Sequence, residues 1–135
     1  MDIKKINDII AVSGQVGAGD MAAIAKAGFK SVICNRPDGE SGDQPAFSEI
    51  EQAAKIAGLA IRHLPVISGR MTATDVEDFG KVFDELPKPI FAYCRTGTRC
   101  ATLWALDQKS RGSNGSDILA ATQSAGYDLS AIIRG

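Results

Sequence analysis

The segment Ala92-Tyr93-Cys94-Arg95-Thr96-Gly97-Thr98-Arg99-Cys100 has the residue types and the spacing of a nucleophilic cysteine site. An apolar run precedes Cys94, a glycine-containing loop follows it, and a helical pattern begins near Arg99. The N–H groups of such a loop, together with the positively polarised start of a helix, form a nest for an anion. The anion nearest to that nest is the Cys94 thiolate, whose pKa should fall below the usual value of about 8.5. The sequence therefore predicts a reactive thiolate at Cys94.

The rest of the chain alternates between apolar runs and helical patterns. Strands are predicted at residues 9–14, 31–34, 59–66 and 90–93, and helices at 20–28, 47–57, 72–86, 99–110 and 116–125. We expect Asp20 to cap the first helix and Thr72 or Thr74 to cap the third. This alternation predicts an α/β fold with a mostly parallel central sheet and helices on both faces. In such sheets ligands bind beyond the carboxyl ends of the strands, where Cys94 emerges.

Composition narrows the class of protein. A chain of 135 residues fits a single domain covering residues 1–135. A net charge of −1 argues against nucleic-acid binding, and no apolar run approaches the roughly 20 residues that span a bilayer. The three cysteines are odd in number and lack C-x-x-C spacing, which favours a reducing compartment, and so we expect a cytoplasmic protein. One histidine and three scattered cysteines argue against a structural zinc site, and we predict neither a metal nor a cofactor.

Three segments carry a resemblance to a known family: Val32 to Glu40, His63-Leu64-Pro65-Val66, and Tyr93 to Arg99. The Cys94 loop resembles that of cysteine-dependent protein phosphatases, and the chain as a whole is similar to the phosphatase-like domain of the beta-lactamase hydrolase-like proteins. That resemblance implies a compact protein-tyrosine-phosphatase-like fold. The family also includes members linked to persulfide dioxygenases, which implies a persulfide dioxygenase or another enzyme of sulfur metabolism as a partner.

Two departures from the phosphatase pattern bear on the reaction. Phosphatases space their cysteine and arginine as Cys-x5-Arg, whereas four residues separate Cys94 from Arg99 here, which should narrow the anion cradle. Rhodanese-type sulfurtransferases use a similarly short loop. Related phosphatases also carry an acidic residue after the strand that ends in His63-Leu64-Pro65-Val66, but Ile67-Ser68-Gly69 stands there. A missing general acid would cost a phosphatase ~10²–10⁴-fold in rate.

The departures favour sulfur transfer as the leading hypothesis. Cys94 would attack a small anionic or sulfane-sulfur substrate such as thiosulfate, form a persulfide and pass the sulfur to a thiol, with no general acid needed. The first alternative is a phosphatase that hydrolyses phosphomonoesters through a phosphorylated Cys94. The second alternative is a non-catalytic anion-binding or regulatory module.

The candidate site residues follow from these hypotheses. Cys94 is the predicted nucleophile, and Arg99 is predicted to stabilise the anionic substrate and the transition state. The predicted binding residues are Arg95, Thr96, Gly97, Thr98 and Cys100, although the helical position of Cys100 also suits core packing. The possible accessory residues are Cys34, as a thiol that resolves an oxidised Cys94, Arg36, at a strand end on the active face, and Asp75, as a substitute acid. His63 and Trp104 are expected to be structural.

Overall fold

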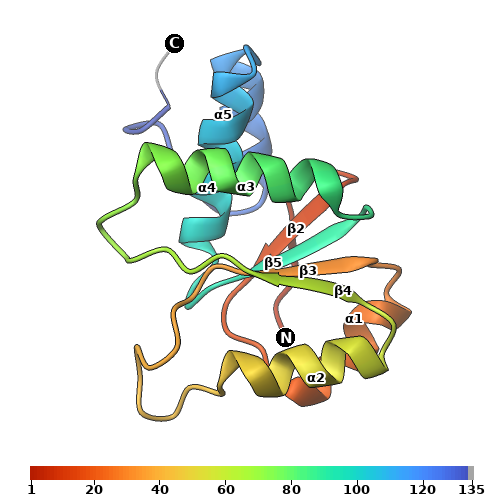
Figure 1. The fold of residues 1–135 in the computed structure, drawn as a ribbon. Coiled ribbons are helices and arrows are strands. Elements are labelled where there is room, and N and C mark those ends of the chain that lie inside the picture. Colours follow the sequence, from red (N-terminus) through yellow and green to blue (C-terminus); the bar gives the residue numbers. More distant parts are fainter. Residues whose placement is uncertain (134–135) are drawn as a thin grey trace.

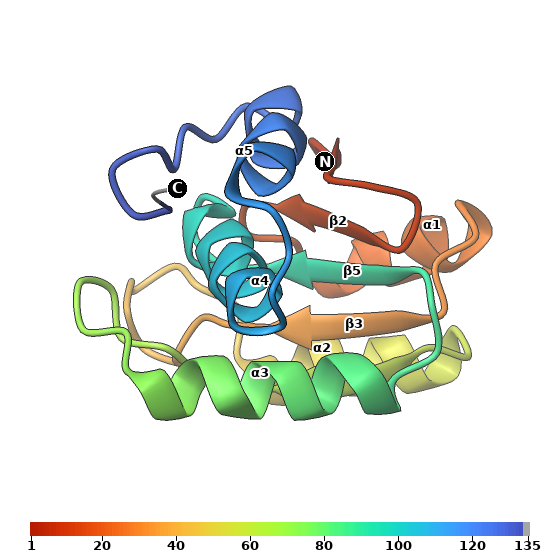
Figure 2. The same cartoon turned by 90° about the horizontal axis from the view of Figure 1, so that it is seen from above.

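A five-stranded sheet lies at the centre of the computed structural model, which describes residues 1–133. The strands lie in the order β1-β2-β5-β3-β4, with β1 at Lys4–Lys5, β2 at Ile10–Ser13, β3 at Ser31–Cys34, β4 at Ala60–His63 and β5 at Ile90–Tyr93. All pairs are parallel except β1 with β2. The carboxyl ends of β2, β5 and β3 therefore meet at one edge, where the strand arrows point the same way (Figure 2).

Helices cover both faces of this sheet (Figure 1). Helices α3 (Ala73–Glu85), α4 (Thr98–Ser110) and α5 (Gly115–Ser124) lie on one side, and α1 (Met21–Lys26) and α2 (Phe47–Ile56) lie on the other. Four-residue strands buried on both sides need apolar residues throughout, which explains the short apolar runs in the sequence. The predicted α/β fold with a mostly parallel sheet is confirmed.

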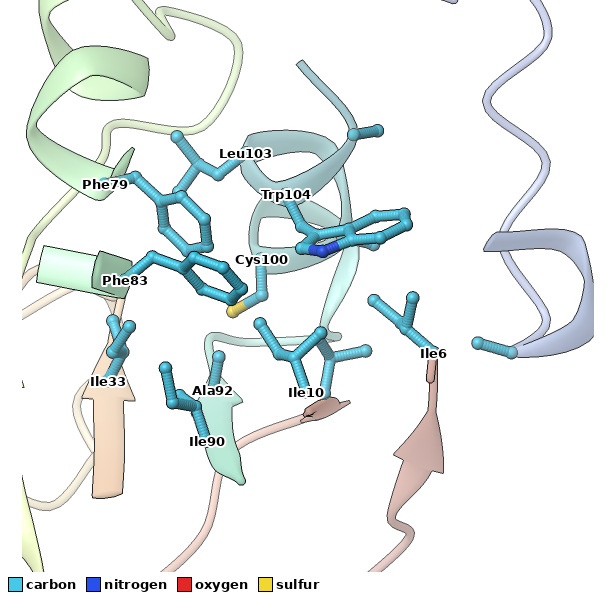
Figure 3. Close-up of a cluster of buried hydrophobic side chains, with 14 of the residues drawn as sticks. Ile6, Ile10, Ile33, Phe79, Phe83, Ile90, Ala92, Cys100, Leu103 and Trp104 are labelled. Atoms are coloured by element: carbon cyan, nitrogen blue, oxygen red, sulfur yellow. The ribbon is translucent and has the colours of Figure 1, made fainter. Parts of the chain in front are cut away.

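Alternation along β5 divides the core into two clusters. Ile90 and Ala92 point toward α3 and α4, in the cluster that also holds Cys100 (Figure 3). Phe91 and Tyr93 point toward α1 and α2. Because successive side chains of a strand alternate between faces, Cys94 continues the pattern and belongs to the first cluster. Cys94, the predicted nucleophile, is thus placed on the α4 side of the sheet.

The structure corrects several details of the predicted elements. The two-residue strand β1 is absent from the prediction because Lys4–Lys5 has no apolar alternation. Asp20 occupies the N-cap position of α1 as predicted, but its side chain makes no capping bond to that helix: the carboxylate accepts the N–H of Gly17 at 2.8 Å, ahead of a 3₁₀ turn at Ala18–Asp20. Strand β4 ends at His63, three residues earlier than the predicted end at residue 66. Thr72 caps α3 as one of the two predicted alternatives.

Within residues 1–133, none of the helices has both the length and the apolar character needed to cross a bilayer.

Candidate active site around Cys94

Cys94 leaves β5 and enters a tight loop that leads directly into α4. The loop turns at Gly97, which has a φ of +90° and immediately precedes the helix. A Cβ at this position would collide with the hydroxyl of Tyr127, so both backbone conformation and space require glycine. A Cβ on Gly14, at the end of β2, would meet the carbonyl oxygen of Arg95 at 2.9 Å. Close packing from two sides therefore fixes the loop.

The sulfur of Cys94 is surrounded by hydrogen-bond donors although the residue is fully buried. The N–H of Gly97 donates to the sulfur at 3.1 Å. A hydrogen bond from the Cys100 thiol and others from the N–H groups of Cys100, Thr96 and Arg99 outweigh burial and lower the pKa of Cys94 to about 5. The predicted nest is present, and Cys94 is a thiolate at neutral pH.

Arg99 lies beside that sulfur and is held in place by Glu40. Its two terminal nitrogens donate to the two carboxylate oxygens of Glu40 at 2.7 and 2.9 Å, and Nη1 also donates to the Val66 carbonyl at 2.8 Å. The bond to Glu40 raises the pKa of Arg99, which also interacts with the Cys94 sulfur. A two-point pair of this kind fixes the plane of a guanidinium as well as its position. Glu40 therefore fixes both the position and the orientation of the Arg99 guanidinium.

Arg36 extends this network into the interior. Its Nε donates to Glu40 at 2.9 Å and its Nη1 to the side-chain oxygen of Gln15 at 2.9 Å, and only 5% of the residue is exposed. The hydrogen bonds from Arg99 and Arg36 lower the pKa of Glu40 to about 2. Glu40 was not among the residues predicted from the sequence, although it ends one of the segments that carried the family resemblance. The resemblance therefore included Glu40, but the sequence does not show that its carboxylate pairs with Arg99 and Arg36.

The remaining predicted loop residues face outward. Arg95, Thr96 and Thr98 are exposed, and the hydroxyls of the two threonines lie 3.1 Å apart. All three residues, with Arg99, line a cavity of about 970 Å³ that opens over the loop. The carbonyl oxygen of Thr96 accepts a hydrogen bond from the Tyr127 hydroxyl at 2.9 Å. The loop thus presents its side chains to a ligand while its backbone encloses the sulfur.

Cys100 and Cys34 lie on opposite faces of the sheet. Cys100 is completely buried in the α4-side cluster (Figure 3) and hydrogen-bonds the Cys94 sulfur, and it is not among the residues that line the cavity. Cys34 belongs to the cluster under α1 and α2, and its thiol donates to the Arg36 carbonyl at 3.4 Å. Of the two thiols, Cys100 is the one that the fold places on the Cys94 side.

Asp75 and His63 take part in local structure. The Asp75 carboxylate accepts the Thr72 N–H at 2.9 Å, which completes a capping box at the start of α3. The His63 ring stacks on Phe47 with centroids 4.3 Å apart, and Nε2 lies 2.9 Å from the Arg36 carbonyl. Residues 1–133 contain no group of three or more His, Cys, Asp or Glu side chains arranged to hold a metal ion.

Comparison with known proteins places this site in a family. The model of the phosphatase-like domain of the beta-lactamase hydrolase-like protein matches residues 2–111. The chain belongs to this family. It is 35% identical over 135 residues to the beta-lactamase hydrolase-like protein of Agrobacterium fabrum, covering 99% of this chain and 31% of that protein. The chain therefore spans about a third of the length of this curated relative.

Solved structures show the same architecture. A crystal structure of a candidate phosphatase from Neisseria meningitidis matches with a TM-score of 0.86 and 37% identity, covering 97% of this chain and 93% of that chain. The active form of Tk-PTP matches with a TM-score of 0.70 over 99% of this chain and 88% of that chain; at 17% identity this likeness shows the fold alone. The fold is that of protein tyrosine phosphatases, and the site is that of a cysteine-dependent, phosphatase-like enzyme.

Proposed function

We propose that this domain hydrolyses phosphomonoesters through a phosphorylated Cys94. One observation carries the proposal: the Cys94 sulfur lies inside a ring of loop N–H groups, beside an arginine that is held by a carboxylate. Three kinds of group are thereby combined, a nucleophile, donors for the phosphoryl oxygens and a fixed positive charge. The family and the relative from Neisseria meningitidis favour this reaction over sulfur transfer, which the sequence analysis had placed first.

The reaction would take place in two displacements. The Cys94 thiolate attacks phosphorus, a sulfur–phosphorus bond forms, and the bond to the ester oxygen breaks with its electron pair leaving on that oxygen. Water then attacks phosphorus, the sulfur–phosphorus bond breaks, inorganic phosphate departs and the thiolate is restored. Loop N–H groups and Arg99 stabilise the charge on the phosphoryl oxygens in both steps. The leaving oxygen takes its proton from solvent, and the attacking water leaves its proton on the phosphate.

The carboxylates around the site suggest which esters react fastest. Glu40 is paired with two arginines, Asp75 caps α3, and Asp107 accepts from Arg111 Nε at 2.9 Å. These three acceptors are engaged, residues 67–69 carry no carboxylate, and the other acidic residue of the cavity lining, Glu77, comes from α3 and not from the segment where related phosphatases carry their acid. Esters whose leaving oxygen needs little protonation are consequently preferred, and aryl phosphates belong to this class.

Sulfur transfer stands as the second candidate. The four-residue spacing between Cys94 and Arg99 supports it, because a shorter loop encloses less space than a Cys-x5-Arg loop. A thiolate with a pKa of about 5 would also attack a sulfane sulfur readily. The two reactions leave different groups on the same atom, a phosphoryl group or a sulfur atom, and mass spectrometry distinguishes them.

The decisive experiment measures p-nitrophenol release from p-nitrophenyl phosphate, together with intact mass after rapid acid quenching. We expect turnover and a phosphoryl adduct on the wild-type domain, and neither with C94S. A parallel incubation with thiosulfate tests for the gain of one sulfur atom. Turnover without dependence on Cys94, or a sulfur adduct with no phosphatase activity, would overturn the proposal.

A further inference from the structure

A groove much larger than a phosphate group extends away from the Cys94 loop along α4. The groove has a volume of about 970 Å³ and is lined on the α4 side by Thr98, Thr102, Leu106 and Ser110. These residues recur every fourth position and so form one face of the helix. At 1.5 Å per residue, that face is about 18 Å long. Ligand pockets of about 300–1,000 Å³ accommodate whole drug-sized molecules, so most of this space is available to the part of a substrate beyond its phosphate.

Apolar atoms make up more of the groove's surface than polar atoms do. Met71 precedes α3, Val76 lies on its first turns, and Leu106 faces them from α4. All three are partly buried and pack against the core cluster under α3 and α4, so their positions are fixed by the fold. Ile132, from the C-terminal segment, completes the wall and is 46% exposed. Apolar side chains held open to solvent in a concave surface favour an apolar ligand.

The charges of the groove are separated by sign. Arg95 and Arg99 lie at the Cys94 loop, whereas the other charged lining residues, Glu77 and Asp107, are acidic. Asp107 is two turns or more along α4 from Arg99 and is paired with Arg111. A ligand with one anionic end therefore meets favourable charge at the loop, whereas a second anionic group farther along would meet Glu77 and no basic lining residue.

We propose that this groove binds the leaving group of the substrate as an elongated, uncharged, apolar chain, so that the preferred substrates are amphiphilic phosphomonoesters. The inference rests on the proposed phosphatase function and specifies its substrate class. The phosphate would occupy the Cys94 loop, and the apolar body would lie between Leu106 on one wall and Met71 and Val76 on the other. All parts of the groove lie at one edge of the sheet (Figure 2): the Cys94 loop, the segment before α3 and the C-terminal segment.

The test uses para-alkyl phenyl phosphates with methyl, butyl and octyl chains, each kept below its critical micelle concentration. Their phenols have nearly the same acidity, so the bond-breaking step is held constant while the chain length changes. Each fully buried methylene adds up to about fourfold in affinity. Allowing for incomplete burial, we expect kcat/KM to rise at least about 10-fold from methyl to octyl, mainly through KM.

A matched pair of variants locates the effect in the groove. I132Q places an amide in the apolar wall, and I56Q makes the same change on α2, where Ile56 is 83% exposed and lies outside the groove. We expect I132Q to lower the octyl-to-methyl ratio of kcat/KM about threefold and I56Q to leave it unchanged. L106Q should lower the ratio further, and I132Q keeps the test informative if L106Q unfolds.

Failure of the groove proposal is distinguishable from failure of the proposed function. Equal kcat/KM for all three esters, or a higher value for an acidic phosphotyrosyl peptide, would overturn the groove proposal while hydrolysis stands. If no ester is hydrolysed, the proposed function is wrong. Calorimetry with para-methyl and para-octyl phenylphosphonates on C94S then decides the groove separately: tighter binding of the octyl compound supports it, and equal binding overturns it.

Discussion

Cys34 and Cys94 come at the carboxyl ends of two adjacent parallel strands, and both are buried. Their sulfurs nevertheless have opposite hydrogen-bond roles. The Cys34 thiol donates to the carbonyl oxygen of Arg36 at 3.4 Å, whereas the Cys94 sulfur accepts the N–H of Gly97 at 3.1 Å. Burial raises the pKa of Cys34, while the bond from Cys100 and the loop N–H groups lower the pKa of Cys94 to about 5.

The backbone that follows each cysteine produces this difference. After Cys34 the chain continues as Asn35-Arg36-Pro37, and a carbonyl group faces the sulfur. After Cys94 the chain turns at Gly97 and begins α4, so that N–H groups face the sulfur instead. Both cysteines are buried at a strand end, although on opposite faces of the sheet. The hydrogen bond from the Cys100 thiol and the direction of the peptide groups together decide which of the two is reactive.

Serine substitution gives the largest expected contrast between the two strand ends. C94S should lower aryl phosphatase kcat/KM by at least ~10³-fold, because a serine hydroxyl lacks the low pKa of the thiolate nucleophile. C34S should stay within about threefold of wild type, because Cys34 lies under α1 and α2 on the other face. The measurement is steady-state kinetics with circular dichroism as the control for folding. Comparable losses in both variants would contradict the assignment of Cys94 as the only nucleophile.

The positive charges of Arg99 and Arg95 near Cys94 can also be removed by substitution. R99A should lower kcat/KM by ~10²–10³-fold, the usual loss when one preorganised donor to a transition-state charge is removed. R95A removes the same charge from an exposed position on the same loop, and we expect a loss of less than about 10-fold, mainly in KM and weaker at high salt. Equal effects in the two variants would show that net charge matters and that the geometry imposed by Glu40 does not.

Thiol labelling measures the contrast directly. The lowered pKa means that Cys94 is largely a thiolate above pH 5, so its alkylation by iodoacetamide should increase through about pH 5 and then level off. Cys34 and Cys100 have raised pKa values and should remain protonated at pH 6. Peptide mapping at pH 6 should show Cys94 labelled ~10²-fold faster than either of the others. A labelling midpoint near pH 9 for Cys94 would contradict the nest.

Local patterns in the sequence were sufficient to predict the strand–loop–helix segment around Cys94 and most of the sheet. The segment around Cys94 contains in sequence an apolar run, a cysteine, a glycine and a helix start. The rules by which these residues form a strand, a turn and a helix depend on neighbouring residues and not on the rest of the fold. The strands at residues 31–34 and 90–93 were also predicted with their observed bounds, because each is a short apolar run stopped by turn residues or prolines.

Contacts between residues of distant segments could not be predicted from local patterns. Glu40 is 59 positions from Arg99, and Tyr127 is 31 positions from Thr96, so their contacts depend on the complete tertiary structure. Strand β1 was missed for a related reason, because two lysines acquire a strand conformation only by pairing with β2. Loop length and the missing acid placed sulfur transfer first among the predictions, whereas the family and its relative from Neisseria meningitidis favour the phosphatase alternative.

Glu40 offers a smaller perturbation that tests how Arg99 is aimed. E40Q preserves shape but removes the charge shared by Arg99 and Arg36, and we expect a loss of about 10-fold in kcat/KM. If Glu40 acts through Arg99, adding E40Q to R99A should cause little further loss, which a double-mutant cycle measures. Additive losses in the double variant would mean that Glu40 acts independently of Arg99.

The smallest expected effect follows from removing the Tyr127 hydroxyl, which supports the Cys94 loop by a hydrogen bond. Y127F removes the hydrogen bond to the Thr96 carbonyl at 2.9 Å, and we expect urea denaturation to show a loss of about 1 kcal/mol in the free energy of unfolding. The N–H groups around Cys94 belong to the same loop, so a slight rise in the labelling midpoint should accompany that loss. A Y127F variant with unchanged stability and unchanged labelling would show that Gly14 and Gly97 alone hold the loop.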